Sequence, residues 1–205
     1  GFKFLVDVAR GQKTGFFLDQ RDKRQALVKY AKGKTALNCF SYTGGFSVYA
    51  LSGGAKKVIN VDSSADALEL AKENIKLNKL PEENCEFICQ DAKQYLKSSP
   101  AEKFDLIVLD PPAFIKDRKK KEEGIVGYKN INEAAFKILA DGGILATCSC
   151  SAHLSLQEFR YLLSESAGRA KKSAQILETY THGLDHLGLL PFTEGEYLKC
   201  LFLII

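Results

Sequence analysis

No run of apolar residues in this sequence is long enough to cross a membrane, and its N-terminus shows no signal-peptide pattern. Methionine is absent altogether, including an initiator, and the chain begins abruptly at Gly1-Phe2-Lys3. We therefore expect a fragment of a longer protein without a membrane-spanning segment. Its 205 residues, 45% apolar and 26% charged, are typical of one soluble globular domain with a sizeable core.

Spacings typical of metal ligands are also missing. The three histidines show no ligand pattern, and Cys85 and Cys89 are too far apart for the usual zinc knuckle. The six cysteines lie mostly in apolar, strand-like runs, as reduced core cysteines of cytosolic proteins do. We therefore expect no metal site and a cytoplasmic location, with Cys39 and Cys200 in the core.

Two phosphate-binding motifs do not occur either. The chain contains neither the P-loop pattern G-x-x-x-x-G-K-[ST] nor the dinucleotide pattern G-x-G-x-x-G. The second absence disfavours a nicotinamide-dependent dehydrogenase. The formal net charge of +4 is compatible with an RNA partner, although charge alone does not establish one.

From Thr35 onward, apolar runs alternate with helical patterns. Strands are expected at Thr35–Phe40, Lys57–Val61, Cys85–Cys89, Phe104–Leu109 and Gly143–Cys148. Helices are expected at Phe46–Leu51, Ala65–Asn78, Ala92–Lys97, Ile131–Leu139 and Leu156–Ala167. Repeated strand–helix units predict an α/β fold with a doubly wound, mostly parallel sheet. Ala174–Tyr180 and Tyr197–Ile204 are predicted to add a C-terminal antiparallel hairpin.

Two stretches fall outside this alternation. Phe2–Val8 and Thr14–Leu18 are predicted to form a small N-terminal β-hairpin, followed by a helix over Arg21–Ala31. The charged stretch Phe114–Gly127 is predicted to be a mobile loop over the carboxyl edge of the sheet. Composition leaves open whether this loop contacts substrate or is solvated surface.

Chemically useful residues follow each predicted strand. The stretch Asn38–Phe46, N-C-F-S-Y-T-G-G-F, leads from the first strand into a helix through glycines, which let the backbone approach a ligand. Asp62, Asp91 and Asp110 follow the next three strands, and Cys150 follows the fifth. Ligands of open α/β sheets bind at the carboxyl ends of the strands, so these residues predict one binding site.

The character of this edge favours a nucleoside over a phosphate ligand. Asp62 and Asp91 would repel phosphates, but they can accept hydrogen bonds from a ribose diol and an adenine amine. A nucleoside with a cationic tail suits this pattern, and S-adenosylmethionine fits it.

Five motifs in order, N-C-F-S-Y-T-G-G-F, V-D-S-S, Q-D-A, D-P-P-A-F and T-C-S-C-S, resemble the class I methyltransferases with their Rossmann-like fold. More closely, they resemble the large-subunit ribosomal RNA (cytosine-5) methyltransferase I family. Gly11–Arg21 and Glu194–Lys199 are also typical of that family, so the resemblance covers essentially the whole chain. It implies a methyltransferase domain at 34–205, preceded by a packed hairpin and helix at 1–33. Family members usually carry an N-terminal RNA-binding PUA domain, which this sequence does not include, in agreement with a fragment.

The resemblance implies roles for individual residues. The implied cofactor-binding residues are Phe40, Ser41, Tyr42, Thr43, Gly44, Phe46, Asp62, Ser63, Asp91 and Asp110. The implied contacts to the RNA or target base are Lys13, Arg21, Pro111, Pro112 and Phe114, with Thr14 and Gln20 nearby. The implied nucleophile is Cys150, whose thiolate would add to carbon 6 of cytosine while Asp110 hydrogen-bonds the ring.

Several alternatives stay open at this point. In an extended strand Cys148 and Cys150 would share a face, so spacing does not exclude Cys148 as the nucleophile. A related group of RNA guanine-N7 methyltransferases shares D-P-P-x-F but lacks the cysteine of S-C-S, which favours cytosine here. A non-catalytic module that binds S-adenosylmethionine or RNA is a further alternative, and a homodimer is compatible with all of them.

Overall fold

The computed structural model describes residues 1–9, 11, 15–98, 101–183, 185–186, 189–191 and 195–205. The strands are β1 Thr35–Cys39, β2 Lys57–Asp62, β3 Cys85–Cys89, β4 Phe104–Leu109, β5 Leu139–Ser149, β6 Gln175–Tyr180 and β7 Lys199–Ile204. The helices are α1 Arg21–Ala31, α2 Gly45–Ser52, α3 Ala65–Leu77, α4 Ala92–Lys97, α5 Lys121–Ile138 and α6 Leu156–Arg169, with short 3₁₀ turns at Leu18–Gln20, Glu82–Asn84 and Arg118–Lys120. None of the helices in these described ranges is long and apolar enough to cross a membrane.

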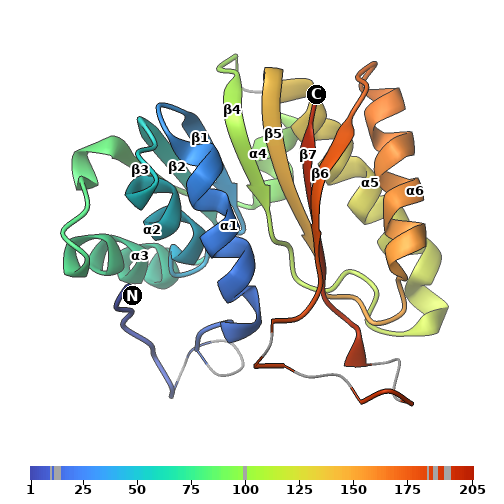
Figure 1. Ribbon diagram of the computed structural model, residues 1–205, viewed down its shortest axis with the longest axis horizontal. Helices are drawn as coiled ribbons and strands as arrows, with labels where there is room; N and C mark the ends of the chain where they lie inside the picture. Colours follow the sequence, from blue (N-terminus) through green and yellow to red (C-terminus); the bar gives the residue numbers. More distant parts are fainter. Residues whose placement is uncertain (10, 12–14, 99–100, 184, 187–188, 192–194) are drawn as a thin grey trace.

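The seven strands form one sheet in the order β3-β2-β1-β4-β5-β7-β6 (Figure 1). Strands β1 to β5 are parallel, and β7 pairs antiparallel with both β5 and β6. The chain moves outward from β1 to β3 and then returns to the other side of β1 as β4. The carboxyl ends of β1 and β4 therefore flank the point where the strand order reverses, which is where such sheets bind ligands. The predicted α/β architecture, including its closing antiparallel strand, is confirmed.

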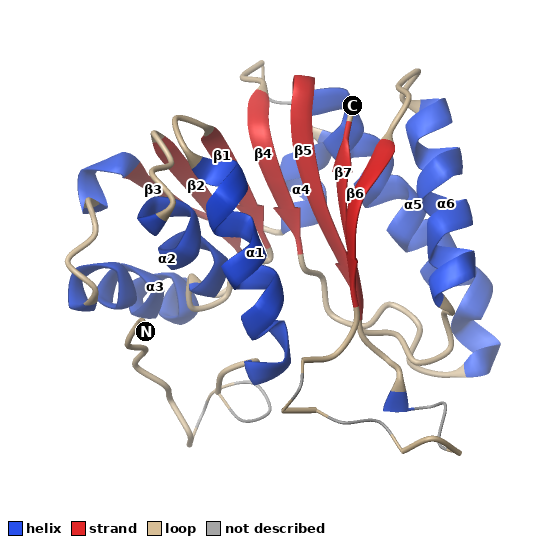
Figure 2. Ribbon diagram, viewed as in Figure 1, coloured by secondary structure: helices blue, strands red, loops and turns tan. Residues whose placement is uncertain are grey.

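Helices cover both faces of the sheet (Figure 2). One core packs β-strand residues such as Leu37 and Ile107 against α4, α5 and α6. The other packs their neighbours, such as Ala36 and Leu106, against α1, α2 and α3. Consecutive strand residues point to opposite faces. A strand that is buried on both faces must be apolar throughout, which explains the continuous apolar runs of the sequence.

The N-terminal hairpin prediction is wrong, because residues 1–9 and 15–17 form no strand. Instead, the backbone N–H groups of Lys3 and Leu5 donate to the side-chain oxygens of Asn78 at 2.9 Å and Asn74 at 2.7 Å. The first residues therefore run along α3 and its C-terminal end. Side-chain amides take the hydrogen bonds that a partner strand would have supplied.

The charged stretch Phe114–Gly127 is also shorter as a loop than predicted, because α5 begins at Lys121. The Asp117 side chain accepts a hydrogen bond from the Lys120 N–H and so caps the 3₁₀ turn Arg118–Lys120, which leads into α5. Buried Gly124 and Tyr128 continue the apolar face of the helix. A Cβ on Gly124 would lie 2.3 Å from Ile115 Cγ1, so this glycine serves helix packing and does not end the helix.

Two glycines with similar left-handed backbones provide a test of this packing. Gly44 has φ 75° and Gly142 has φ 73°, but only at Gly44 would a Cβ meet a neighbour, Ala71 Cβ at 2.9 Å. Gly142→Ala should cost roughly 1–2 kcal/mol of stability through backbone strain alone. Gly44→Ala should cost about 1–3 kcal/mol more through overpacking. Urea unfolding of the two variants measures the difference, and equal losses would contradict the crowding at Gly44.

Candidate active site

The loop that follows β1 is held in a strained shape. Phe40 and Tyr42 have left-handed backbones with φ 59° and 47°, which non-glycine residues rarely adopt. The Asp62 carboxylate holds this loop, because its oxygens accept from the Tyr42 N–H at 2.8 Å and the Ser64 N–H at 3.0 Å. The carboxylate that the sequence analysis assigns to a ribose therefore also braces the cofactor loop.

Protein atoms fill the space beside the glycine pair of this loop. A Cβ on Gly44 would meet Ala71 of α3, and a Cβ on Gly45 would lie 2.8 Å from Arg24 Nε. The sequence analysis ascribed these glycines to the approach of a ligand. Packing against α3 and α1 requires glycine at both positions, and the contact of Gly44 with the cofactor stays a prediction.

Asp110 follows β4 at the centre of the carboxyl edge and is half-buried. Gln20 Nε2 donates a hydrogen bond to its Oδ1 at 2.7 Å. Burial raises the pKa of Asp110 from its usual 3.8 to about 6, although the positive charge of Arg24 opposes this shift. At a pH near 6 this carboxyl therefore exists in both forms and can both donate and accept hydrogen bonds.

Two buried cations of α1, Lys23 and Arg24, lie behind Asp110. Arg24 donates to the Phe17 carbonyl at 2.8 Å, and its guanidinium lies 4.2 Å from the centroid of the Phe16 ring. Burial lowers the pKa of Arg24 to about 10, so it stays charged at neutral pH. The burial of both residues was not evident from the sequence, because the charged pattern of this helix resembles that of a solvated surface helix.

The two candidate nucleophiles lie in different environments. Strand β5 ends at Ser149, so Cys150 leaves the strand and the shared face expected from alternation does not apply. Cys150 is half-buried, and its Sγ lies 3.9 Å from the Pro111 carbonyl oxygen. Cys148 is fully buried beside Cys200, and burial raises the pKa of its thiol well above the usual range. Cys39 and Cys200 are buried in the core, as predicted.

A buried lysine anchors the segment after Cys150. Lys199 begins β7, and its Nζ donates to the Ser151 carbonyl at 2.8 Å and to the Leu154 carbonyl. Burial lowers the pKa of Lys199 to about 8, while interaction with Cys150 opposes this shift. In the sequence, the one sign that Lys199 is buried is its position at the start of an otherwise apolar strand.

The same segment is tied to the loop after β4. The Ile115 N–H donates to Ser151 Oγ at 3.2 Å, and the Tyr128 hydroxyl lies 2.9 Å from that oxygen. The Phe114 ring packs on Tyr128 with 4.7 Å between centroids. These contacts bring the D-P-P-A-F loop and the T-C-S-C-S segment together, as the shared edge of the sheet predicted.

Several buried polar atoms have no hydrogen-bond partner among the described residues, and the oxygens Ser41 Oγ and Gln20 Oε1 are among them at this edge. Leaving such atoms unpaired is costly, so a ligand that supplies donors would relieve them. Asp91 lies exposed after β3, where it caps α4 through a 3.0 Å bond from the Gln94 N–H. Together with Asp62, these acceptors fit the hydroxyl and amine donors of a nucleoside.

The other residues predicted to contact RNA lie in different surroundings. Arg21 points toward carboxylates, with 3.0 Å ion pairs to Asp22 and Asp185. Pro112 is exposed beside the loop. Lys13 and Thr14 lie outside the residues that the structure describes, as does Glu194 of the C-terminal motif.

Comparison with known proteins agrees with this geometry. Residues 1–185 match the family model of S-adenosylmethionine-dependent methyltransferases. Two relatives named Ribosomal RNA large subunit methyltransferase I, from Aeromonas hydrophila and Tolumonas auensis, are 48% and 49% identical over 201 residues. That alignment covers 97% of this chain and 51% of each relative, so the chain spans about half the length of these curated relatives.

A solved structure gives the same fold. A protein assigned as a methyltransferase and crystallised with SAH matches with a TM-score of 0.89 and 27% sequence identity. The match covers 100% of this chain and 54% of the other chain.

Asp110→Asn should remove a pH-dependent loss of stability. Because the folded-state pKa, about 6, exceeds the usual 3.8, the folded protein binds this proton more tightly than the unfolded chain does. Wild-type stability should therefore fall by up to about 3 kcal/mol as the pH rises from about 4 to above about 6, and the variant should lack this fall. Urea unfolding across this pH range measures both proteins.

Asp141→Asn is the matched control for this test. A hydrogen bond from Lys172 lowers the pKa of Asp141, so its contribution to stability should be lost as the pH falls. The two variants should therefore differ from wild type with opposite pH trends. A pH-independent difference between Asp110→Asn and wild type would contradict the raised pKa.

Proposed function

The chain belongs to the S-adenosylmethionine-dependent methyltransferase family, and from that premise we propose that it methylates carbon 5 of a cytosine in large-subunit ribosomal RNA. Cys150 is the proposed nucleophile. The observation that carries the proposal is the position of this thiol, just past β5 and 3.9 Å from the carbonyl of Pro111, the residue that follows Asp110.

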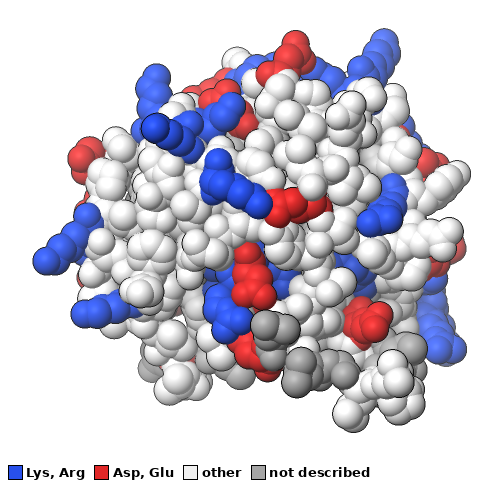
Figure 3. All heavy atoms as spheres, viewed as in Figure 1, with Lys and Arg blue, Asp and Glu red and all other residues white. Residues whose placement is uncertain are grey.

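The names of the relatives support ribosomal RNA as the substrate class, and a ribosomal RNA substrate is consistent with the proposed cytoplasmic location. Surface charge supports RNA only weakly. On the face shown in Figure 3, lysine and arginine side chains are scattered among uncharged and acidic ones. Among the described residues, this face therefore carries no extended basic patch, and the proposed recognition of RNA rests on local features near the active site.

S-adenosylmethionine supplies an electrophilic methyl group when it is bound. In the proposed arrangement Asp62 holds the ribose hydroxyls, Ser63 lies beside the adenine and Asp91 accepts from its amine. The strained loop 40–44 and Phe46 hold the methionine end. Because Asp62 also braces that loop through the Tyr42 N–H, binding of the sugar and the shape of the loop depend on one carboxylate.

The thiol makes carbon 5 of cytosine reactive. The Cys150 thiolate forms a bond to carbon 6, and the electron pair of the 5,6 double bond becomes available at carbon 5. After carbon 5 has taken up the methyl group, it loses its proton to water. The bond between sulfur and carbon 6 then breaks, which restores the double bond and the thiolate.

Asp110 is placed to assist at the ring edge. Electron density builds on the N3 and amine side of the ring while sulfur is bonded to carbon 6. A carboxyl with a pKa of about 6 can hold a proton against N3 and accept a hydrogen bond from the amine. The target base must leave its stack to reach this edge.

Lys199 acts as a positioning residue for the thiolate. It has no carboxylate partner among the described residues, and its ammonium bonds two carbonyls of the segment that begins at Cys150. A cation held at this place favours the charged form of the thiol. Lys199 would thus link the geometry of the segment to the reactivity of Cys150.

Incubation with S-adenosylmethionine and unmodified ribosomal RNA, followed by mass spectrometry of the digested nucleosides, tests the function. We expect 5-methylcytidine with wild type and with Cys148→Ala, and none with Cys150→Ala. Activity in Cys150→Ala but not in Cys148→Ala would reverse the assignment of the nucleophile. Another methylated nucleoside would keep the cofactor and overturn the thiol mechanism.

Lys199→Met should raise the pKa of the Cys150 thiol by about one unit or more, because a nearby positive charge is lost. The rate of Cys150 alkylation by iodoacetamide as a function of pH, read by peptide mass spectrometry, measures this pKa. Lys137→Met on the exposed face of α5 is the control. Buried Cys39 should stay unreactive, which shows that the variant is folded. An unchanged pKa in a folded Lys199→Met protein would rule out this role.

A further inference from the structure

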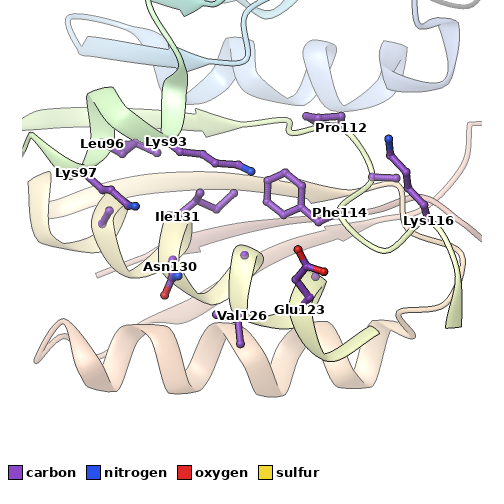
Figure 4. A pocket seen from close by; sticks show the side chains of 14 residues that line it. Lys93, Leu96, Lys97, Pro112, Phe114, Lys116, Glu123, Val126, Asn130 and Ile131 are labelled. Carbon is purple, nitrogen blue, oxygen red and sulfur yellow. The ribbon is translucent and has the colours of Figure 1, made fainter. Parts of the chain in front are cut away.

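A pocket of about 480 Å³ lies next to the candidate active site, between α4, the loop after β4 and α5 (Figure 4). The residues of its wall that matter here are Lys93, Lys97, Pro112, Phe114, Lys116 and Glu123. Its volume is typical of sites that bind small molecules or parts of larger ligands. The cofactor loop and the predicted ribose and adenine contacts do not line it.

The pocket adjoins the reacting thiol through the D-P-P-A-F loop. The Pro111 carbonyl is 3.9 Å from Cys150 Sγ, and the next residue, Pro112, already lines the pocket. The pocket and the thiol therefore lie on consecutive residues of one loop, within reach of neighbouring nucleotides of one strand.

The lining combines an aromatic ring with cations. The Phe114 ring is fixed by its contact with Tyr128, and the Lys93 ammonium lies 4.3 Å from its centroid. In Figure 4, Lys93 and Lys116 extend on either side of the Phe114 ring. The lining contains three lysines and one carboxylate, that of Glu123, so its formal charge is positive. A flat ring with flanking cations is the chemistry that proteins use for single-stranded nucleic acid.

We propose that this pocket binds the RNA nucleotide adjacent to the methylated one, with its base displacing the Lys93 ammonium from above the Phe114 ring and its phosphate held by Lys93 and Lys116. The proposal rests on an RNA substrate. When the target base is unstacked, its neighbour loses a stacking partner. The Phe114 ring replaces that partner and so offsets part of the cost of unstacking.

The phosphate contacts are tested by binding of fluorescent single-stranded RNA at several salt concentrations. The double variant Lys93→Ala/Lys116→Ala should bind about tenfold or more weakly at low salt, and its logarithmic salt slope should shrink by about 1.4, for two lost phosphate contacts. Lys32→Ala/Lys56→Ala is the control, because both lysines are exposed and precede β1 and β2 at the opposite edge of the sheet. Equal effects of the two pairs would overturn the proposal.

The base contact is tested with RNA oligonucleotides that contain the methylated nucleotide and an abasic site on its 5′ or its 3′ side. With wild type, one of the two abasic RNAs should bind roughly 5- to 100-fold more weakly, the range expected for a lost stacking contact. With Phe114→Leu, which keeps an apolar side chain but no aromatic face, that abasic site should cause little further loss. If wild type and Phe114→Leu lost the same affinity for each of the two abasic RNAs, the proposed base contact would be wrong.

These outcomes are independent of the reaction mechanism, because binding is measured without turnover. Methylation of a base other than cytosine would defeat the proposed function and leave both binding tests valid. Tight RNA binding that ignores the pocket variants would defeat this inference alone.

Discussion

Burial of the parallel sheet on both faces is the constraint on which the active site depends. Strands that are covered by helices on each side must be apolar, so charged and reactive groups can stand only where strands end. Asp62, Asp110 and Cys150 all follow that rule at the carboxyl edge. Two polar exceptions inside the sheet, Asn38 and Asn60, both bond to Ser47, although Asn38 Oδ1 has no hydrogen-bond partner among the described residues.

The same constraint explains what the sequence could reveal. Apolar runs located all seven strands, and the residues that follow them predicted a binding site at the carboxyl edge of the sheet. Contacts between distant residues were not visible. The predicted N-terminal hairpin failed because Asn74 and Asn78, far along the chain, take its backbone donors. The start of α5 was missed because buried Gly124 looks like a loop glycine until its contact with Ile115 is known.

Burial of charge was equally hidden from the sequence. Arg24 and Lys199 look like ordinary surface cations in the sequence, yet both are buried near groups proposed to act in the reaction. Their pKa values are lowered because water is excluded, and nearby acidic groups oppose the change. Residues proposed to contact a ligand follow a recognisable spacing in the sequence, whereas residues that shift the pKa values of their neighbours are recognised only from their burial.

The order of strands also has a consequence for how the protein is made. Strand β7 follows β6 in the chain but lies between β5 and β6 in the sheet. While the polypeptide emerges from the ribosome, β5 keeps an open edge and β6 has no partner until residues 199–204 have been synthesised. The anchor for the Cys150 segment arrives with that same strand. A nascent chain can thus pair β1 to β4 and form the loop after β1 before β7 emerges, whereas the segment after Cys150 is anchored only once β7 has been made.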